Sequence, residues 1–233
     1  MAKGLALVYL VVYNVACCLG WGFVLFVCAK HAHANSIDQM WPELEMGLKV
    51  VQTAAVLEVV HSLVGLVKSP WVTALMQVFS RVWTLWAVMH VAPSAQTSIF
   101  TLLACSSWAL VEVPRYAFYA LNLLDAVPYP LLWLRYSLFA VLYPTGITGE
   151  LGCMYMAALF LAGVDTPFDL DIAKLQTQPQ ENLALLALVV FVAVTYIPGS
   201  PTMYGHMVKT RKKQLEIYKN GGKAPEKKTK KAL

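Results

Sequence analysis

Long apolar segments recur along nearly the whole chain, separated by short polar stretches. A helix needs about 20 mostly apolar residues to cross about 30 Å of hydrocarbon, and these segments have that length or more. Because lipid offers no hydrogen-bond partners, each segment must satisfy its own backbone, which indicates helices. The pattern therefore predicts an all-α, polytopic membrane bundle of about six transmembrane helices. The expected spans are residues 5–28, 47–67, 71–92, 97–120, 130–163 and 182–205.

The fifth segment, residues 130–163, is too long for one simple crossing, since its 34 residues would make about 50 Å of helix. Pro144 and Gly146 lie inside it, and an internal proline removes a backbone donor and crowds the preceding turn. We therefore expect this helix to be broken near Pro144, or to consist of two short helices. One crossing here gives six spans, whereas two crossings would give seven.

The composition supports a membrane protein, because 58% of the residues are hydrophobic and only 13% are charged. The net charge of +5 arises at the C-terminus, where ten of the 18 Lys and Arg residues lie between Lys209 and Lys231. The positive-inside rule places this tail in the cytosol, and six spans then make both termini cytosolic. We expect residues 1–205 to form the transmembrane bundle and residues 206–233 to form a basic cytosolic tail.

The tail ends in Lys230-Lys231-Ala232-Leu233, which resembles the dilysine retrieval signal of endoplasmic reticulum membrane proteins. The predicted location is therefore the endoplasmic reticulum membrane, with lipid surrounding the spans. The tail follows a hydrophobic span and carries few aromatic residues, so nucleic acid is not an expected partner. The five cysteines lie in apolar segments without metal-type spacing, so neither a disulfide framework nor a metal site is predicted.

Charged residues inside the apolar spans are the main candidates for function. A charge at mid-bilayer costs about 2.5 to 3.5 kcal/mol on insertion scales, so these residues must face one another or a wet cavity. They can serve as interhelical contacts, but such a set more often marks a substrate or proton path. Two pairs, Glu58 with His61 and Glu112 with Arg115, have the spacing that shares one helical face. The charged residues are Glu58, Arg81, Glu112, Arg115, Arg135 and Glu150.

Tyr143 and Glu150 are seven residues apart, so on an intact helix their side chains would face one cavity. The interruption at Pro144-Thr145-Gly146 would free backbone groups that only a polar cavity tolerates. A phenol and a carboxylate are a workable acid and base pair, which predicts an active site here. A transporter is the natural alternative for such a chain, but neither inverted repeats nor a second broken helix are evident.

Five stretches of sequence carry a resemblance to a known family. They are QTAAVLEVVHSLVGLVKSP (52–70), QVFSRVWTLWAV (77–88), SWALVEVPRYAFYAL (107–121), WLRYSLFAVLYPTGITGE (133–150) and YIPGSPTMY (196–204). In order and content they resemble the very-long-chain (3R)-3-hydroxyacyl-CoA dehydratases, also called protein-tyrosine-phosphatase-like proteins, and the plant form in particular. Residues 61–68 loosely resemble a tyrosine phosphatase loop, but serine replaces the nucleophilic cysteine and lysine the arginine, so we reject phosphatase chemistry.

The resemblance implies an endoplasmic reticulum enzyme that removes water from (3R)-3-hydroxyacyl-CoA to give trans-2-enoyl-CoA, the third step of fatty acid elongation. It implies an acyl-CoA substrate and, as partners, the condensing enzyme, the ketoacyl-CoA reductase and the enoyl-CoA reductase. The family's catalytic pair falls on Tyr143 and Glu150. Its other site positions fall on Glu58, Gln77, Arg81, Glu112, Arg115, Arg135 and Gly146.

Eliminating water beside a thioester requires a base for the C2 proton and an acid for the departing hydroxyl. We expect Glu150 to be the base and Tyr143 the acid, with the reversed assignment left open. Arg81, Arg115 or Arg135 could stabilise the enolate-like oxygen, and no metal or redox cofactor is needed. The alternatives to this function are a non-catalytic membrane scaffold of the elongase complex and a small-molecule transporter.

Overall fold

The computed structural model describes residues 2–67, 71–169 and 171–220, and every regular element in these ranges is helical. This confirms the all-α class. The elements are α1 (Ala2–His33), η1 (Ile37–Gln39), α2 (Met40–Ala54), α3 (Val56–Leu63), α4 (Trp71–Trp83), the π-helical η2 (Thr84–Met89), α5 (Pro93–Gln96), α6 (Ile99–Asn122), α7 (Tyr129–Ser137), α8 (Phe139–Ala162), η3 (Pro167–Asp169), α9 (Ile172–Thr177) and α10 (Gln180–Lys219).

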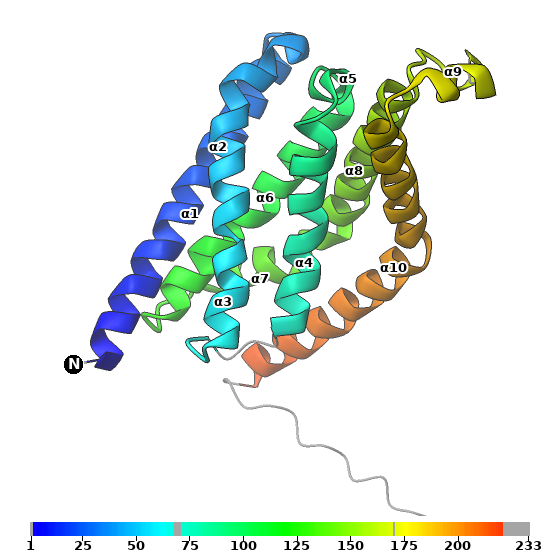
Figure 1. Cartoon of the computed structure of the whole chain (residues 1–233). Helices are drawn as coiled ribbons and strands as arrows, with labels where there is room; N and C mark the ends of the chain where they lie inside the picture. Colours follow the sequence, from blue (N-terminus) through cyan, green and yellow to red (C-terminus); the bar gives the residue numbers. More distant parts are fainter. Residues whose placement is uncertain (1, 68–70, 170, 221–233) are drawn as a thin grey trace, which may run out of the picture.

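The long helices run beside one another, and the chain passes back and forth along the bundle (Figure 1). The beginning of α1 and the end of α10 lie at the same end of the molecule (Figure 1). Helix α9 and the turns around it lie at the opposite end. The two ends of the described chain are therefore arranged as an even number of crossings would require.

Four stretches in the described residues are long and apolar enough to cross a membrane: Gly4–His33, Ile37–Leu63, Phe139–Asp169 and Gln180–Lys219. The chain is therefore a helical membrane protein, but the expected count of about six spans is not confirmed. The expected spans 71–92 and 97–120 do form helices. Helix α4 has only 13 residues before the π-helical segment, and α6 carries Glu112 and Arg115 within its length.

The expected break near Pro144 is corrected by the structure, because α8 runs through this proline without interruption. The helix is interrupted at Leu138 instead, where α7 ends and α8 begins. A proline crowds the turn that precedes it, so its effect is felt on the N-terminal side of its own position. With only nine residues, α7 is too short to cross alone, and it continues into α8 as one pass along the bundle.

Helix α6 lies at the centre of the bundle and packs against α1 on one side and α8 on the other. The contact with α8 is close because α8 presents glycines to α6. An added Cβ at Gly149 would lie 2.5 Å from the backbone nitrogen of Ala104, and one at Gly152 would lie 2.1 Å from the ring of Phe100. Helix α10 lies at the edge of the bundle and packs mainly against α8 and α7.

Helix α2 begins at Met40, before the expected span 47–67, and so includes the acidic residues Glu43 and Glu45. Basic side chains compensate for both carboxylates: Lys30 Nζ lies 2.7 Å from Glu43 and Lys49 Nζ lies 2.5 Å from Glu45. At the other terminus α10 continues to Lys219, so the first part of the expected tail is helical. The dilysine-type sequence at Lys230 and Lys231 lies outside the described residues and stays a prediction.

Candidate active site

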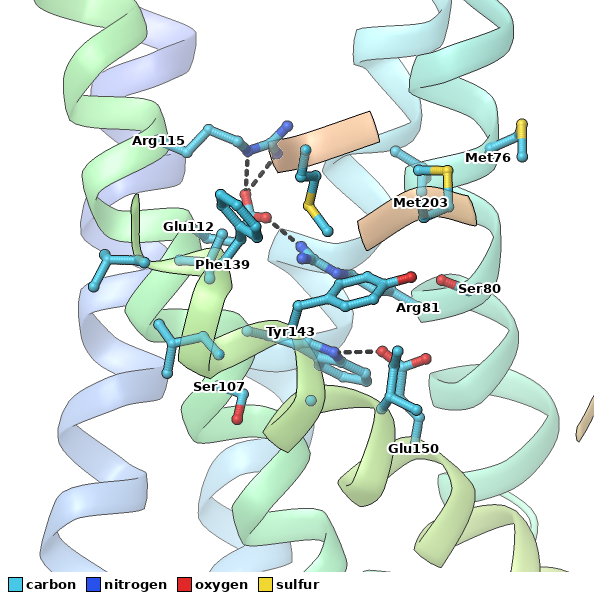
Figure 2. Close-up of a pocket in the computed structure, with 18 of the residues that line it drawn as sticks. Met76, Ser80, Arg81, Ser107, Glu112, Arg115, Phe139, Tyr143, Glu150 and Met203 are labelled. Carbon is cyan, nitrogen blue, oxygen red and sulfur yellow. Dashed lines mark hydrogen bonds and ion pairs between the residues drawn. The ribbon is translucent and has the colours of Figure 1, made fainter. Parts of the chain in front are cut away.

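A cavity of about 410 Å³ lies between α4, α6, α7, α8 and α10. It brings together most of the residues that sequence reasoning selected for function (Figure 2). Charges that would be costly in lipid therefore share a polar interior space, as their desolvation cost requires. The selected residues that line it are Arg81, Glu112, Arg115, Arg135, Tyr143, Gly146 and Glu150.

Glu150 is buried, with 6% of its surface exposed, and two neighbouring helices hold its carboxylate. The indole Nε1 of Trp108 on α6 donates to Oε1 at 2.8 Å, and the hydroxyl of Tyr196 on α10 donates to Oε2. Both donors are neutral, and among the described residues Glu150 forms no ion pair. The carboxylate is thus fixed in orientation by neutral donors, and no arginine of the described residues forms an ion pair with it.

Tyr143 lies two turns before Glu150 on α8, and both side chains line the cavity. Figure 2 shows the Tyr143 ring above Glu150 and beside Arg81. The phenol oxygen of Tyr143 donates a long hydrogen bond of 3.4 Å to the carbonyl of Ser200 on α10. A bond of this length is weak, so the hydroxyl remains available to a group that enters the cavity.

Glu112 is buried, with 2% of its surface exposed, and it accepts hydrogen bonds from two arginines on different helices (Figure 2). Arg81 Nη1 on α4 donates to Oε1, and Arg115 Nε on α6 donates to Oε2 at 2.6 Å. The spacing of Glu112 and Arg115 along one face of a helix therefore does produce a contact. Figure 2 shows this group on the opposite side of Tyr143 from Glu150.

Arg115 extends the ion pairs to α3, because its two terminal nitrogens each lie 2.8 Å from a carboxylate oxygen of Glu58. The hydroxyl of Tyr116 also donates to Glu58. Glu58 is thus connected to the cavity through Arg115 rather than lining it directly. His61, which shares the helical face of Glu58, forms its 2.8 Å hydrogen bond with Tyr9 instead.

Arg135 on α7 is the arginine of the cavity that is not paired with a carboxylate in the described residues. Its Nη2 donates to the Tyr119 hydroxyl at 3.1 Å, and its guanidinium lies 5.5 Å from the ring centres of Tyr119 and Tyr136. Its Nε is buried and has no partner in the part of the chain that the structure describes. Arg135 therefore lines the cavity with a positive charge that no carboxylate of the described residues neutralises.

Gly146 and Gln77 are the two remaining predicted positions. A Cβ added at Gly146 would lie 3.6 Å from Cβ of Ser107, an ordinary contact, so the glycine keeps the cavity wide without being needed for helix packing. Gln77 belongs to α4, but its side chain lies outside the described part of the structure.

Sequence reasoning missed Trp108 and Tyr196, the two donors to Glu150. Neither residue is charged, and a Trp or Tyr in an apolar span usually packs or anchors at the membrane interface. Tyr196 does stand two residues before Pro198 in α10, and prolines inside a helix are a signal of a kink. Only the folded chain brings Tyr196 against Glu150, which lies 46 residues earlier in the sequence.

The fold and the cavity together define a helical membrane protein with a charged cavity inside the bundle. The family described as "Protein tyrosine phosphatase-like protein, PTPLA" matches residues 52–217, and the chain belongs to this family. No solved structure gives a significant match to the chain.

Three relatives show the same family across most of the chain. The very-long-chain (3R)-3-hydroxyacyl-CoA dehydratase hpo-8 of Caenorhabditis elegans is 42% identical over 214 residues, 89% of this chain and 94% of that protein. The very-long-chain (3R)-3-hydroxyacyl-CoA dehydratase 2 of Homo sapiens is 37% identical, over 91% of this chain and 82% of that protein. The dehydratase PASTICCINO 2 of Arabidopsis thaliana is 34% identical, over 89% of this chain and 93% of that protein.

Proposed function

We propose that the chain is a membrane-embedded hydro-lyase that removes water from very-long-chain (3R)-3-hydroxyacyl-CoA to give trans-2-enoyl-CoA, the dehydration step of fatty acid elongation. The observation that carries this proposal is the pair Tyr143 and Glu150 on one cavity, in a chain whose relatives are named as dehydratases of this kind. A phenol and an oriented carboxylate supply the acid and the base that the elimination needs.

In this mechanism Glu150 takes the proton from C2 of the substrate, and Tyr143 protonates the hydroxyl that leaves C3 as water. The electron pair of the C2–H bond becomes the new double bond, and the proton on Glu150 must return to Tyr143 before the next turnover. The contacts support this assignment over the reverse. Two donors orient the Glu150 carboxylate, whereas the Tyr143 hydroxyl is held only by a 3.4 Å bond and can reach a ligand.

Among the three arginines, Arg135 is the one we assign to the thioester oxygen, where negative charge develops as the C2 proton leaves. Arg81 and Arg115 are already bound to carboxylates, while Arg135 lines the cavity without a carboxylate partner among the described residues. In this proposal the Glu58–Arg115–Glu112–Arg81 chain shapes the cavity and positions α3, α4 and α6 around it.

The location and partners follow from the same proposal. The C-terminal segment is basic, and the start of α1 and the end of α10 lie at the same end of the bundle (Figure 1). Both observations support the proposal that residues 1–205 form the transmembrane bundle and that both termini are cytosolic. We propose the endoplasmic reticulum as the membrane, where an elongation dehydratase would work with the condensing enzyme, the ketoacyl-CoA reductase and the enoyl-CoA reductase. The acyl-CoA substrate would enter from the cytosol, where its polyanionic CoA stays hydrated.

The test is a turnover assay with the protein purified in detergent and a long-chain 3-hydroxyacyl-CoA, with the enoyl-CoA product followed by mass spectrometry. We expect Tyr143→Phe and Glu150→Gln each to lower kcat by about 10² to 10⁴-fold, the usual contribution of a general acid or base. Tyr204→Phe is the matched control, because its ring lies 6.2 Å from that of Tyr143 but does not line the cavity.

Thermal unfolding of each variant shows whether a loss of activity reflects chemistry or folding. If the wild-type protein forms no product, or if folded variants react at the wild-type rate, the proposed catalytic role of Tyr143 and Glu150 is excluded. The scaffold and the transporter would then be the leading explanations of the cavity.

A further inference from the structure

The cavity has an apolar part that the reaction itself does not use. Beyond the charged residues, its wall consists of long aliphatic, methionine and phenylalanine side chains from α4, α7, α8 and α10. Methionine is flexible and adapts to apolar ligands of varying shape. These residues are Met76, Leu134, Leu138, Phe139, Leu142, Met203 and Met207.

This apolar part reaches the outer surface of the bundle between α4 and α10. Met76 lines the cavity and is also 56% exposed, so the cavity continues to the outer surface of the protein. Figure 2 shows Met76 of α4 and Met203 of α10 on the same side of the cavity, beyond Arg81.

Helix packing explains why the wall is open here. Helix α4 packs mainly on α3, η2 and α2, whereas α10 packs mainly on α8 and α7 and contacts η2. Helix α10 also contains Pro198 and Pro201, and it bends along its length (Figure 1).

The cavity is too small for the whole substrate. Its volume of about 410 Å³ is in the range of pockets that enclose a drug-sized ligand, and a very-long-chain acyl-CoA is several times larger. Only the reacting carbons and the adjacent methylenes can be enclosed. The rest of the acyl chain is apolar, so it must leave the cavity into an apolar medium rather than into water.

We propose that the acyl chain of the substrate leaves the cavity between α4 and α10, past Gly199, and continues into the hydrocarbon of the bilayer. This inference rests on the proposed dehydratase function and adds the path of the acyl chain and a residue that the chain passes. Gly199 lines the cavity on α10, and a Cβ added there would meet no atom within 4 Å. The space beside Gly199 is therefore open in the protein, and the acyl chain is the group that occupies it.

The experiment compares Gly199→Leu with wild type on 3-hydroxyoctanoyl-CoA and 3-hydroxyeicosanoyl-CoA, with kcat/KM measured for both. The short acyl chain ends inside the cavity, whereas the long one must pass position 199. We expect the ratio of kcat/KM for the long substrate to that for the short one to fall at least about tenfold, the effect of extra carbon groups in an apolar pocket. Gly205→Leu is the matched control, because it lies on the same helix, has equally open space and does not line the cavity.

A second variant, Met203→Trp, narrows the same exit one helical turn further along α10 and should shift the ratio in the same direction. An unchanged ratio in folded Gly199→Leu and Met203→Trp would overturn the proposed path, as would the same shift in Gly205→Leu. Wild-type protein that dehydrates neither substrate would instead exclude the proposed function, so the two failures are distinguishable.

Discussion

Gly149 lies between α6 and α8, where an added Cβ would stand 2.5 Å from the backbone of Ala104, whereas at Gly199 beside the cavity it would meet no atom within 4 Å. The same residue type thus has two uses in one bundle. On the side formed by α6 and α8, glycine lets two backbones approach. On the side formed by α4 and α10, it leaves a space that no protein atom fills.

The two sides are also held together differently. The side formed by α6 and α8 is a close packing of small and apolar residues, including Ala104 and Ala157, both fully buried. The side with the cavity is crossed by polar links, from Arg81 to Glu112 and from Tyr196 to Glu150. The comparison teaches that changes between α6 and α8 should affect folding, whereas changes in links that reach the cavity should affect catalysis unless they leave a charge unpaired.

The largest expected effect on stability comes from Arg115, because this buried arginine forms ion pairs with two carboxylates. Replacing Arg115 with Met removes both contacts to Glu58 and the contact to Glu112, and removing one partner of a buried ion pair costs about 3 to 5 kcal/mol. We expect a marked drop in the thermal unfolding temperature in detergent.

The double variant Arg115→Met with Glu58→Gln serves as the control, because it removes the unpaired charge and should recover part of this loss. A single variant as stable as wild type would mean that the ion pairs do not hold α3 to α6.

The second effect tests the glycines themselves. Gly149→Ala forces a methyl group against the backbone of Ala104, and such overpacking costs about 1 to 3 kcal/mol. Gly146→Ala places its methyl group at an ordinary 3.6 Å from Ser107 Cβ and should unfold at nearly the wild-type temperature. Equal unfolding temperatures for the two variants would show that the approach of α6 and α8 is not limiting.

The smallest effect on stability concerns Tyr196, which should matter for the rate rather than for the fold. Tyr196→Phe removes a donor to Glu150, and a hydrogen bond to a charged group contributes about 1.5 to 3 kcal/mol, or roughly tenfold or more in rate. We expect kcat to fall with KM little changed, and the isotope effect for a substrate deuterated at C2 to rise.

Tyr155→Phe provides the comparison, since Tyr155 lies on α8 but is exposed away from the cavity. A rise in KM at constant kcat in Tyr196→Phe would mean that this residue binds substrate and does not position the base.

Much of the fold was accessible from the sequence because hydropathy acts locally. The expected span 97–120 corresponds to α6 (Ile99–Asn122), and 130–163 corresponds to α7 and α8 together. The break was misplaced, since α8 stays helical through Pro144 and the interruption lies at Leu138, which carries no proline or glycine signal in the sequence. The number of spans is likewise a property of the assembled bundle, because α6 carries its charges into a protein interior rather than into lipid.

By itself the sequence determined that Glu112, Arg115 and Glu150 could not face lipid, because the desolvation cost belongs to each residue and its apolar surroundings. Only the tertiary structure decided their partners. Arg115 pairs with Glu58, 57 residues away in the sequence. Glu150 accepts hydrogen bonds from the neutral donors Trp108 and Tyr196 rather than from an arginine of the described residues. Contacts between helices depend on how the faces of whole helices pack, and no local pattern along the chain contains that information.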